Sequence, residues 1–88
     1  MSDLDERFEA AQAAVNQLKH RPDDETLLEL YSYFKQATIG DASGPRPGPF
    51  DFVARAKYDA WEGRRGMSRE VAKRGYIKLL EHLQQQQD

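Results

Sequence analysis

The chain has 88 residues, with 13 Lys and Arg, 15 Asp and Glu, and a formal net charge of −2. This length predicts a single domain spanning 1–88, and the weakly acidic balance argues against nucleic-acid binding, which favours a basic surface. Cysteine is absent, which excludes disulfides and thiolate metal sites and favours a reducing compartment. The acidic start lacks the apolar region of a signal peptide, and no apolar run approaches the ~20 residues that span a bilayer. We therefore expect a cytoplasmic protein without stable membrane insertion.

The charges are unevenly divided along the chain. Residues 1–44 carry four Lys and Arg against nine Asp and Glu, whereas residues 45–88 carry nine against six. Most such charges solvate helix surfaces. The basic second half nevertheless leaves room for a local anion site.

Two helices are predicted in the first half. The first spans about 4–19 and is capped by Ser2, because apolar residues recur at spacings of three and four up to the turn at 20–22. These apolar residues are Leu4, Phe8, Ala11, Val15 and Leu18. The second helix begins after Asp23 or Asp24, runs to about Ile39 and ends at Gly40, a typical C-terminal glycine.

The predicted second helix has two stripes. One is suited to a core and contains Leu27, Leu30, Phe34 and Ala37. The neighbouring stripe combines an apolar, an aromatic and a cationic side chain, from Leu28, Tyr31 and Lys35. Because residues three and four apart are neighbours on a helix surface, these three form a continuous strip.

A long loop and two further helices complete the predicted fold. Residues 41–50 contain three prolines and two glycines, which disfavour regular structure. A third helix over about 51–64 directs Phe52, Ala56, Ala60 and Trp61 inward, and a fourth, capped by Ser68, directs Val71, Ala72, Tyr76, Leu79, Leu80 and Leu83 inward. The polar segment 84–87 is expected to fray. No period-two pattern predicts a strand, so we expect an all-α four-helix bundle in which the long loop permits a crossover.

The sequence offers little for catalysis. His20 and His82 lie far apart, neither has an obvious orienting partner, and the serines lack a nucleophile-elbow context. Gly63 and Gly66 lack the Lys-Ser/Thr of a phosphate loop, and no second cluster completes a metal site around His20. We expect neither an enzyme nor a protein with a metal or cofactor.

The strip on the second helix predicts a binding site instead. Tyr31 and Lys35 could hold a flat anionic group beside the apolar Leu28, and Lys57 and Tyr76 could add a cation and a ring. Each residue taken alone is more typical of packing at the edge of a core or of a solvated surface. Spacing and composition therefore indicate a helical bundle with a possible site for an anionic, aromatic ligand.

A series of motifs resembles one known family. They are Tyr-Ser-Tyr-Phe-Lys-Gln-Ala-Thr-Ile-Gly-Asp at 31–41, Arg-Pro-Gly at 46–48, Asp-Phe at 51–52, Ala-Lys-Tyr-Asp-Ala-Trp at 56–61, Gly-Met-Ser at 66–68 and Tyr-Ile at 76–77. Their order and spacing are similar to those of the acyl-CoA-binding protein family from Phe8 to about Leu83. Because many motifs keep their register, the resemblance is far more specific than one motif would be.

The resemblance implies an up-down-down-up bundle that binds one medium- to long-chain acyl-CoA. Carried over by position, Tyr31, Lys35 and Lys57 would hold the 3′-phosphate, and the Phe34 and Tyr76 rings would pack against the CoA part. Leu27 and Leu28 match positions near the acyl chain. The implied protein is a monomeric, non-catalytic carrier that holds acyl-CoA as its ligand, has no cofactor and contacts acyl-CoA-using enzymes transiently.

Several positions depart from the family pattern. Phe34 replaces a tyrosine, Asn16 and Val53 replace common lysines, and Tyr58 replaces a tryptophan. The lost hydroxyl and cations predict binding that is weaker and less dependent on salt than in a lysine-rich relative. Gly75 is unusual as well, because glycine inside a helix costs about 1 kcal/mol relative to alanine. It could allow a helix or the ligand to approach closely beside Tyr76, or it could merely be tolerated.

Two alternative functions remain open from the sequence. The losses at Phe34, Asn16 and Val53 would suit a helical protein-interaction module that no longer binds acyl-CoA. A helix-turn-helix DNA-binding protein is the other alternative, with the fourth helix as its only candidate recognition helix, although the acidic balance opposes it.

Overall fold

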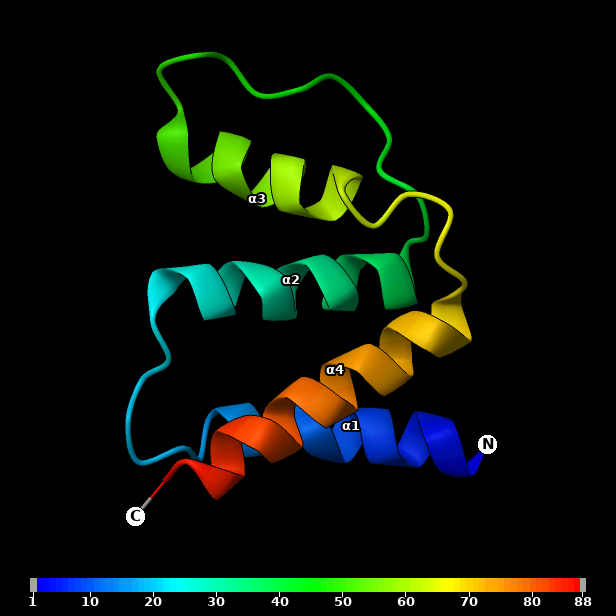
Figure 1. Cartoon of the computed structure of the whole chain (residues 1–88). Helices are drawn as coiled ribbons and strands as arrows, with labels where there is room; N and C mark the ends of the chain where they lie inside the picture. The colour runs from blue at the N-terminus through cyan, green and yellow to red at the C-terminus, as the bar shows by residue number, and fades with distance from the viewer. Residues whose placement is uncertain (1, 88) are drawn as a thin grey trace.

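The computed structural model describes residues 2–87, which form four α-helices and no strand. They are α1 (Asp3–Val15), α2 (Asp24–Thr38), α3 (Phe52–Glu62) and α4 (Arg69–Gln85). In Figure 1, α1 and α4 run one way while α2 and α3 run the other, so the bundle is up-down-down-up. The prediction of an all-α four-helix bundle is confirmed.

The helices lie side by side in the spatial order α3, α2, α4, α1 (Figure 1). Within the described residues, α3 packs against no helix other than α2, and α1 packs mainly on α4. The molecule is therefore flat, with principal extents of 38 × 30 × 15 Å. This arrangement leaves α3 at one edge, supported by a single neighbouring helix.

The hydrophobic core lies between α1, α2 and α4. Its buried members are Phe8, Ala11, Leu30, Ala37, Ala72, Tyr76, Ile77, Leu80 and Leu83. The rings of Phe8 and Tyr76 meet edge to face with centroids 5.2 Å apart, an arrangement that aromatic quadrupoles favour. Helix α3 contributes no residue to this cluster, so the core and the outer edge of the bundle are separate regions.

The predicted helix caps form as expected. The Ser2 hydroxyl accepts the N–H of Asp5 at 3.1 Å, the Asp23 carboxylate accepts that of Thr26 at 2.8 Å, and the Ser68 hydroxyl accepts that of Val71 at 3.1 Å. At the other end of α2, Gly40 has φ of +99°, a backbone conformation that glycine adopts without the steric cost of a Cβ.

The ends of the outer helices differ from the prediction. Helix α1 ends at Val15 rather than Lys19, because residues 16–18 switch to the tighter i→i−3 hydrogen bonds. The predicted fraying of 84–87 is wrong, since α4 continues to Gln85 and Gln87 is anchored beyond it. The Gln87 amide accepts the His20 N–H at 2.9 Å and donates to the His20 carbonyl at 3.4 Å. This contact holds the α1–α2 connection against the end of α4.

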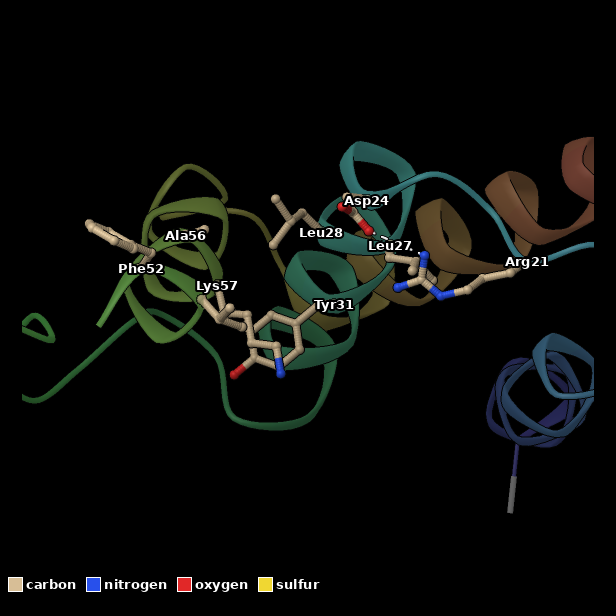
Figure 2. A pocket seen from close by; sticks show the side chains of 9 residues that line it. Arg21, Asp24, Leu27, Leu28, Tyr31, Phe52, Ala56 and Lys57 are labelled. Carbon is tan, nitrogen blue, oxygen red and sulfur yellow. Dashed lines mark hydrogen bonds and ion pairs between the residues drawn. The ribbon is translucent and has the colours of Figure 1, made fainter. Parts of the chain in front are cut away.

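Two predicted inward residues are on the surface. Phe52 is 73% exposed and Val71 is 51% exposed. Phe52 opens α3, which has only one helix beside it, so its side chain is directed away from α2 (Figure 2). Val71 lies in the first turn of α4, next to the buried Ala72 but around the helix from the face that carries Tyr76 and Leu80.

The Asp41 carboxylate connects the end of α2 to the segment that precedes α4. The buried Gln36 side chain donates to Asp41 Oδ1 at 2.8 Å and to the Met67 carbonyl at 2.9 Å. The Gly66 N–H donates to the same Asp41 oxygen at 2.8 Å. These donors, with the Gly66 N–H first, lower the pKa of Asp41 below its usual value of 3.8.

The lowered pKa predicts how this junction responds to acid. An ionised Asp41 stabilises the folded state above the usual carboxyl range, and this contribution is lost as the pH falls through the lowered pKa. Asp41→Asn should therefore be less stable than the wild type near neutral pH, and the difference should shrink between about pH 4 and pH 2. Urea unfolding across this range measures it. A constant difference at every pH would contradict the role given to the charge.

Gly75 is required by the packing of α2 on α4. A Cβ at Gly75 would overlap Tyr33 Cε1 and lie 2.8 Å from Tyr33 Cδ1. On the same ring, the Arg64 guanidinium carbon lies 3.9 Å from the centroid. The close approach predicted at Gly75 is thus made by Tyr33 of α2.

Gly75→Ala should lower the free energy of unfolding by roughly 1–3 kcal/mol, the cost of overpacking, although alanine is the better helix former. In a Tyr33→Ala background, the same substitution should raise the free energy of unfolding by about 1 kcal/mol, since only the helix propensity remains. Urea unfolding of the four proteins tests this reversal of sign. Stabilisation by Gly75→Ala alone would show that the Tyr33 ring does not restrict the site.

Candidate functional site

A groove with a volume of about 620 Å³ lies between α2 and α3 (Figure 2). Its lining comes from the segment before α2, from α2 and from the first half of α3: Arg21, Asp24, Leu27, Leu28, Tyr31, Phe52, Val53, Ala56 and Lys57. Helix α3, which contacts no other helix than α2 among the described residues, forms one wall of this groove.

The groove has an apolar middle and polar ends. The apolar lining comes from Leu27 and Leu28 of α2 and from Val53 and the small Ala56 of α3. At the end near the start of α2, Arg21 and Asp24 form an exposed ion pair at 3.2 Å. At the other end, Tyr31 and Lys57 lie beside each other (Figure 2). Such a lining suits an amphiphile better than a uniformly polar or uniformly apolar molecule.

Two cation–ring pairs cross from α2 to α3. Lys57 Nζ lies 5.3 Å from the centroid of the Tyr31 ring, and Lys35 Nζ lies 4.7 Å from that of Trp61. The ring comes from α2 in the first pair and from α3 in the second. Because the two helices are parallel, residues four apart on one helix meet residues four apart on the other. The result is a ladder of two cations and two rings along the seam.

Trp61 anchors this ladder to the loop that precedes α3. It is 7% exposed, and its indole N–H donates to the Gly40 carbonyl at 2.7 Å. The Tyr58 ring packs edge-on against it with centroids 6.2 Å apart. The indole is therefore fixed by a hydrogen bond and by packing, which places a rigid surface under Lys35.

The loop itself is fastened to α3 by side chains. Arg46 and Asp59 form two parallel hydrogen bonds of 2.8 and 2.7 Å, and the guanidinium lowers the pKa of the Asp59 carboxyl. The Tyr58 hydroxyl donates to the Gly44 carbonyl at 3.2 Å. Past the end of α3, Arg65 donates to the Ala42 carbonyl at 2.7 Å. These contacts hold a proline-rich segment without regular structure along the outer side of α3.

The predicted site residues fall into two groups. Leu27, Leu28, Tyr31 and Lys57 line the groove, and Lys35 lies one turn beyond Tyr31 on the same face of α2. Phe34 and Tyr76 do not line it.

Phe34 and Tyr76 both meet Phe8 in the core. Phe34 is half-buried with its ring centroid 6.3 Å from that of Phe8, while Tyr76 is 6% exposed. Burial raises the pKa of the Tyr76 hydroxyl. Their contacts with a ligand remain predictions.

Five lining residues were not predicted as part of the site. They are Arg21, Asp24, Phe52, Val53 and Ala56. A usable signal existed for Val53, which lies four residues before Lys57 and so shares its helix face. Arg21 precedes α2 in an irregular segment, and no periodicity could have placed it against Leu27.

A metal-holding cluster and a membrane-spanning helix are both absent from the described residues. No group of three His, Asp or Glu side chains among residues 2–87 is arranged to hold a metal ion. None of the helices in this range is long and apolar enough to cross a bilayer. The distinctive chemistry of the site is the combination of two lysines, two aromatic rings and an apolar trough.

Comparison with known proteins gives a consistent result. The family model described as acyl CoA binding protein matches residues 5–80. An acyl-CoA-binding protein homolog from Manduca sexta is 47% identical over 81 residues, which cover 91% of this chain and 90% of the relative. The acyl-CoA-binding protein of Saccharomyces cerevisiae is 45% identical over 76 residues, covering 86% and 87%. The crystal structure of Oryza sativa acyl-CoA-binding protein 2 superimposes with a TM-score of 0.90 at 36% identity, covering 94% and 92%.

Proposed function

Because the chain belongs to the acyl-CoA-binding protein family, we propose that it binds medium- to long-chain acyl-CoA in the groove between α2 and α3. The observation that carries this assignment is the ladder of Lys35, Lys57, Tyr31 and Trp61 at one end of an apolar trough. A ligand that matches both regions carries concentrated negative charge, a flat ring and a long apolar chain. Acyl-CoA combines all three.

The phosphates of CoA bind at the Tyr31–Lys57 end. Two ammonium groups and the Tyr31 side chain lie within about one helical turn of each other along the seam between α2 and α3. Hydrogen bonds from cations to phosphate oxygens are about twice as strong as neutral ones. The lysines rest on aromatic faces in this structure, so phosphate binding replaces a weak cation–ring attraction with a stronger ionic contact.

The acyl chain lies in the trough between Leu27, Leu28 and Ala56. Burial of each CH₂ group contributes about 0.8 kcal/mol, so affinity rises with chain length until the trough is filled. Val53 extends the apolar wall at a position where a lysine is common in the family. This chain therefore has apolar surface where a relative has a phosphate contact. Contacts with the acyl chain should contribute more to its binding free energy, and ionic contacts less.

The protein acts as a carrier and not as a catalyst. It holds acyl-CoA without changing it, as a monomer in the cytoplasm, and passes it to acyl-CoA-using enzymes through transient contacts. The absence of cysteine is compatible with a reducing compartment. The Phe34 and Tyr76 rings, which both contact Phe8 in this structure, would pack against the CoA part of the ligand.

The first test compares three ligands by isothermal titration calorimetry. Palmitoyl-CoA should bind with one-to-one stoichiometry, free CoA much more weakly, and palmitate weakest of all, since only the first engages both the cations and the trough. A series from C8 to C20 acyl-CoA should show affinity rising and then levelling. Equal affinity for the three ligands, or no heat with any of them, would refute the assignment.

The second test concerns the cations. Lys35→Ala and Lys57→Ala should each weaken palmitoyl-CoA binding by about 1.5–3 kcal/mol, the range for a hydrogen bond to a charged group. Lys78→Ala, the same change at an exposed position of α4, serves as the matched control and should leave affinity unchanged. If Lys35→Ala behaves like the control, the phosphate is held elsewhere.

A further inference from the structure

Three large apolar side chains are exposed together where the loop enters α3. Phe50 is 90% exposed, Phe52 is 73% and Val53 is 68%, and we refer to residues 50–53 as the α3 tip. The other two large apolar side chains exposed by half or more among the described residues are Ile39, which caps the end of α2, and Val71 of α4, each 51% exposed. A gathering of exposed rings marks an interaction surface, whereas single exposed apolar residues are normal.

The tip is an ordered part of the fold. The Asp51 N–H donates to the Gly48 carbonyl at 3.1 Å, and the Arg55 N–H donates to the Asp51 carbonyl at 2.9 Å. The bidentate Arg46–Asp59 pair fastens the loop just before it. Hydrogen bonds thus hold the backbone on both sides of the tip, and both phenylalanine side chains are exposed on it.

The tip is also continuous with the groove. Phe52 and Val53 belong to the groove lining as well as to the exposed patch. Figure 2 shows Phe52 at the outer margin of α3, directed away from α2. Because α3 is the outermost helix (Figure 1), the tip has no further helix beyond it. Because Phe52 and Val53 belong to both, a surface that contacts the tip lies next to one end of the groove.

Two cations lie one turn behind the apolar tip. Arg55 follows Phe52 by three residues, and Lys57 follows Val53 by four, so each cation shares a helix face with an apolar residue. Asp51 is the single carboxylate in 50–57. In a bilayer, a layer of anionic headgroups covers the hydrocarbon. Apolar side chains at the tip could reach below the headgroups, while the cations, about one helical turn farther along α3, lie at their level.

We propose that the α3 tip docks reversibly on the surface of an anionic phospholipid bilayer. Phe50 and Phe52 enter the interfacial layer, Arg55 meets lipid phosphates, and the end of the groove beside the tip opens onto the membrane. This inference rests on the proposed function: an acyl-CoA in the bilayer can then enter the groove without crossing bulk water. The negative charge of Asp51 limits the attraction and keeps docking transient.

A second copy of the chain fits the tip less well than a bilayer does. Two opposed tips would bring the cations of both chains together. Three side chains also cover far less than the ~800 Å² per partner that a stable protein interface buries. Charge complementarity therefore favours a lipid surface.

Vesicle flotation tests the proposal with two matched pairs of variants. The vesicles are phosphatidylcholine alone or phosphatidylcholine with about 30% phosphatidylserine, in low salt, where ionic attraction is least screened. The wild type should float with the anionic vesicles and far less with the neutral ones. Phe50→Ser should reduce the bound fraction by roughly tenfold, since a buried ring is lost, whereas Val71→Ser should have no effect. Arg55→Gln should reduce it by roughly fivefold, whereas Arg74→Gln, on α4, should not.

Further measurements separate the possible explanations. Phe50 is outside the groove lining, so Phe50→Ser should keep wild-type affinity for palmitoyl-CoA in calorimetry without vesicles and a wild-type helical circular dichroism spectrum. Absence of wild-type flotation with anionic vesicles, or equal flotation of Phe50→Ser and Val71→Ser, would overturn the docking proposal. A dimer in sedimentation that Phe50→Ser abolishes would also overturn it, in favour of a second copy. If palmitoyl-CoA gives no heat with the wild type, the proposed function fails whatever the vesicles show.

Discussion

The site depends on the parallel alignment of α2 and α3, which the loop between them imposes. Helices joined by a short turn run antiparallel, so a parallel pair requires a connection that returns along the whole seam. Here residues 39–51 make that return, and hydrogen bonds from Trp61 to Gly40 and between Arg46 and Asp59 fasten the loop to α3. In an antiparallel pair, the order of Lys57 and Trp61 would be reversed relative to Tyr31 and Lys35, and the cation–ring ladder could not form.

In this flat bundle, most of the residues that form the core are different from those that line the groove. The apolar core lies between α1, α2 and α4, and the Gly75–Tyr33 contact allows α2 to approach α4 closely. Helix α3 contributes nothing to that core, and its inner face forms one wall of the groove. A helix supported on one side leaves an open seam for a ligand. Its free end can present Phe50 and Phe52 outward, which a helix enclosed by neighbours could not do.

Much of the seam between α2 and α3 could be predicted because it follows from helical periodicity on single helices. Leu28, Tyr31 and Lys35 share one face of α2, and the structure places them along the seam as the pattern indicated. The resemblance to the acyl-CoA-binding protein family is confirmed. Periodicity also placed Phe34 and Tyr76 on inward faces of their helices, and there both rings meet Phe8. The contacts of these two rings with a ligand, which the family resemblance implies, stay a prediction.

The sequence by itself determined the helices and their caps, because Ser2, Asp23, Ser68 and Gly40 act on neighbouring backbone groups. It also determined the class of ligand, because the motifs of the family keep their register along the chain. Only the tertiary structure decided what the segment after α4 contacts, since Gln87 forms a hydrogen bond with His20, which lies 67 residues earlier in the chain. It likewise decided that Phe52 faces outward and that each lysine lies on the ring of the other helix. These outcomes depend on which helix lies beside which, and no local pattern of residues encodes that neighbourhood.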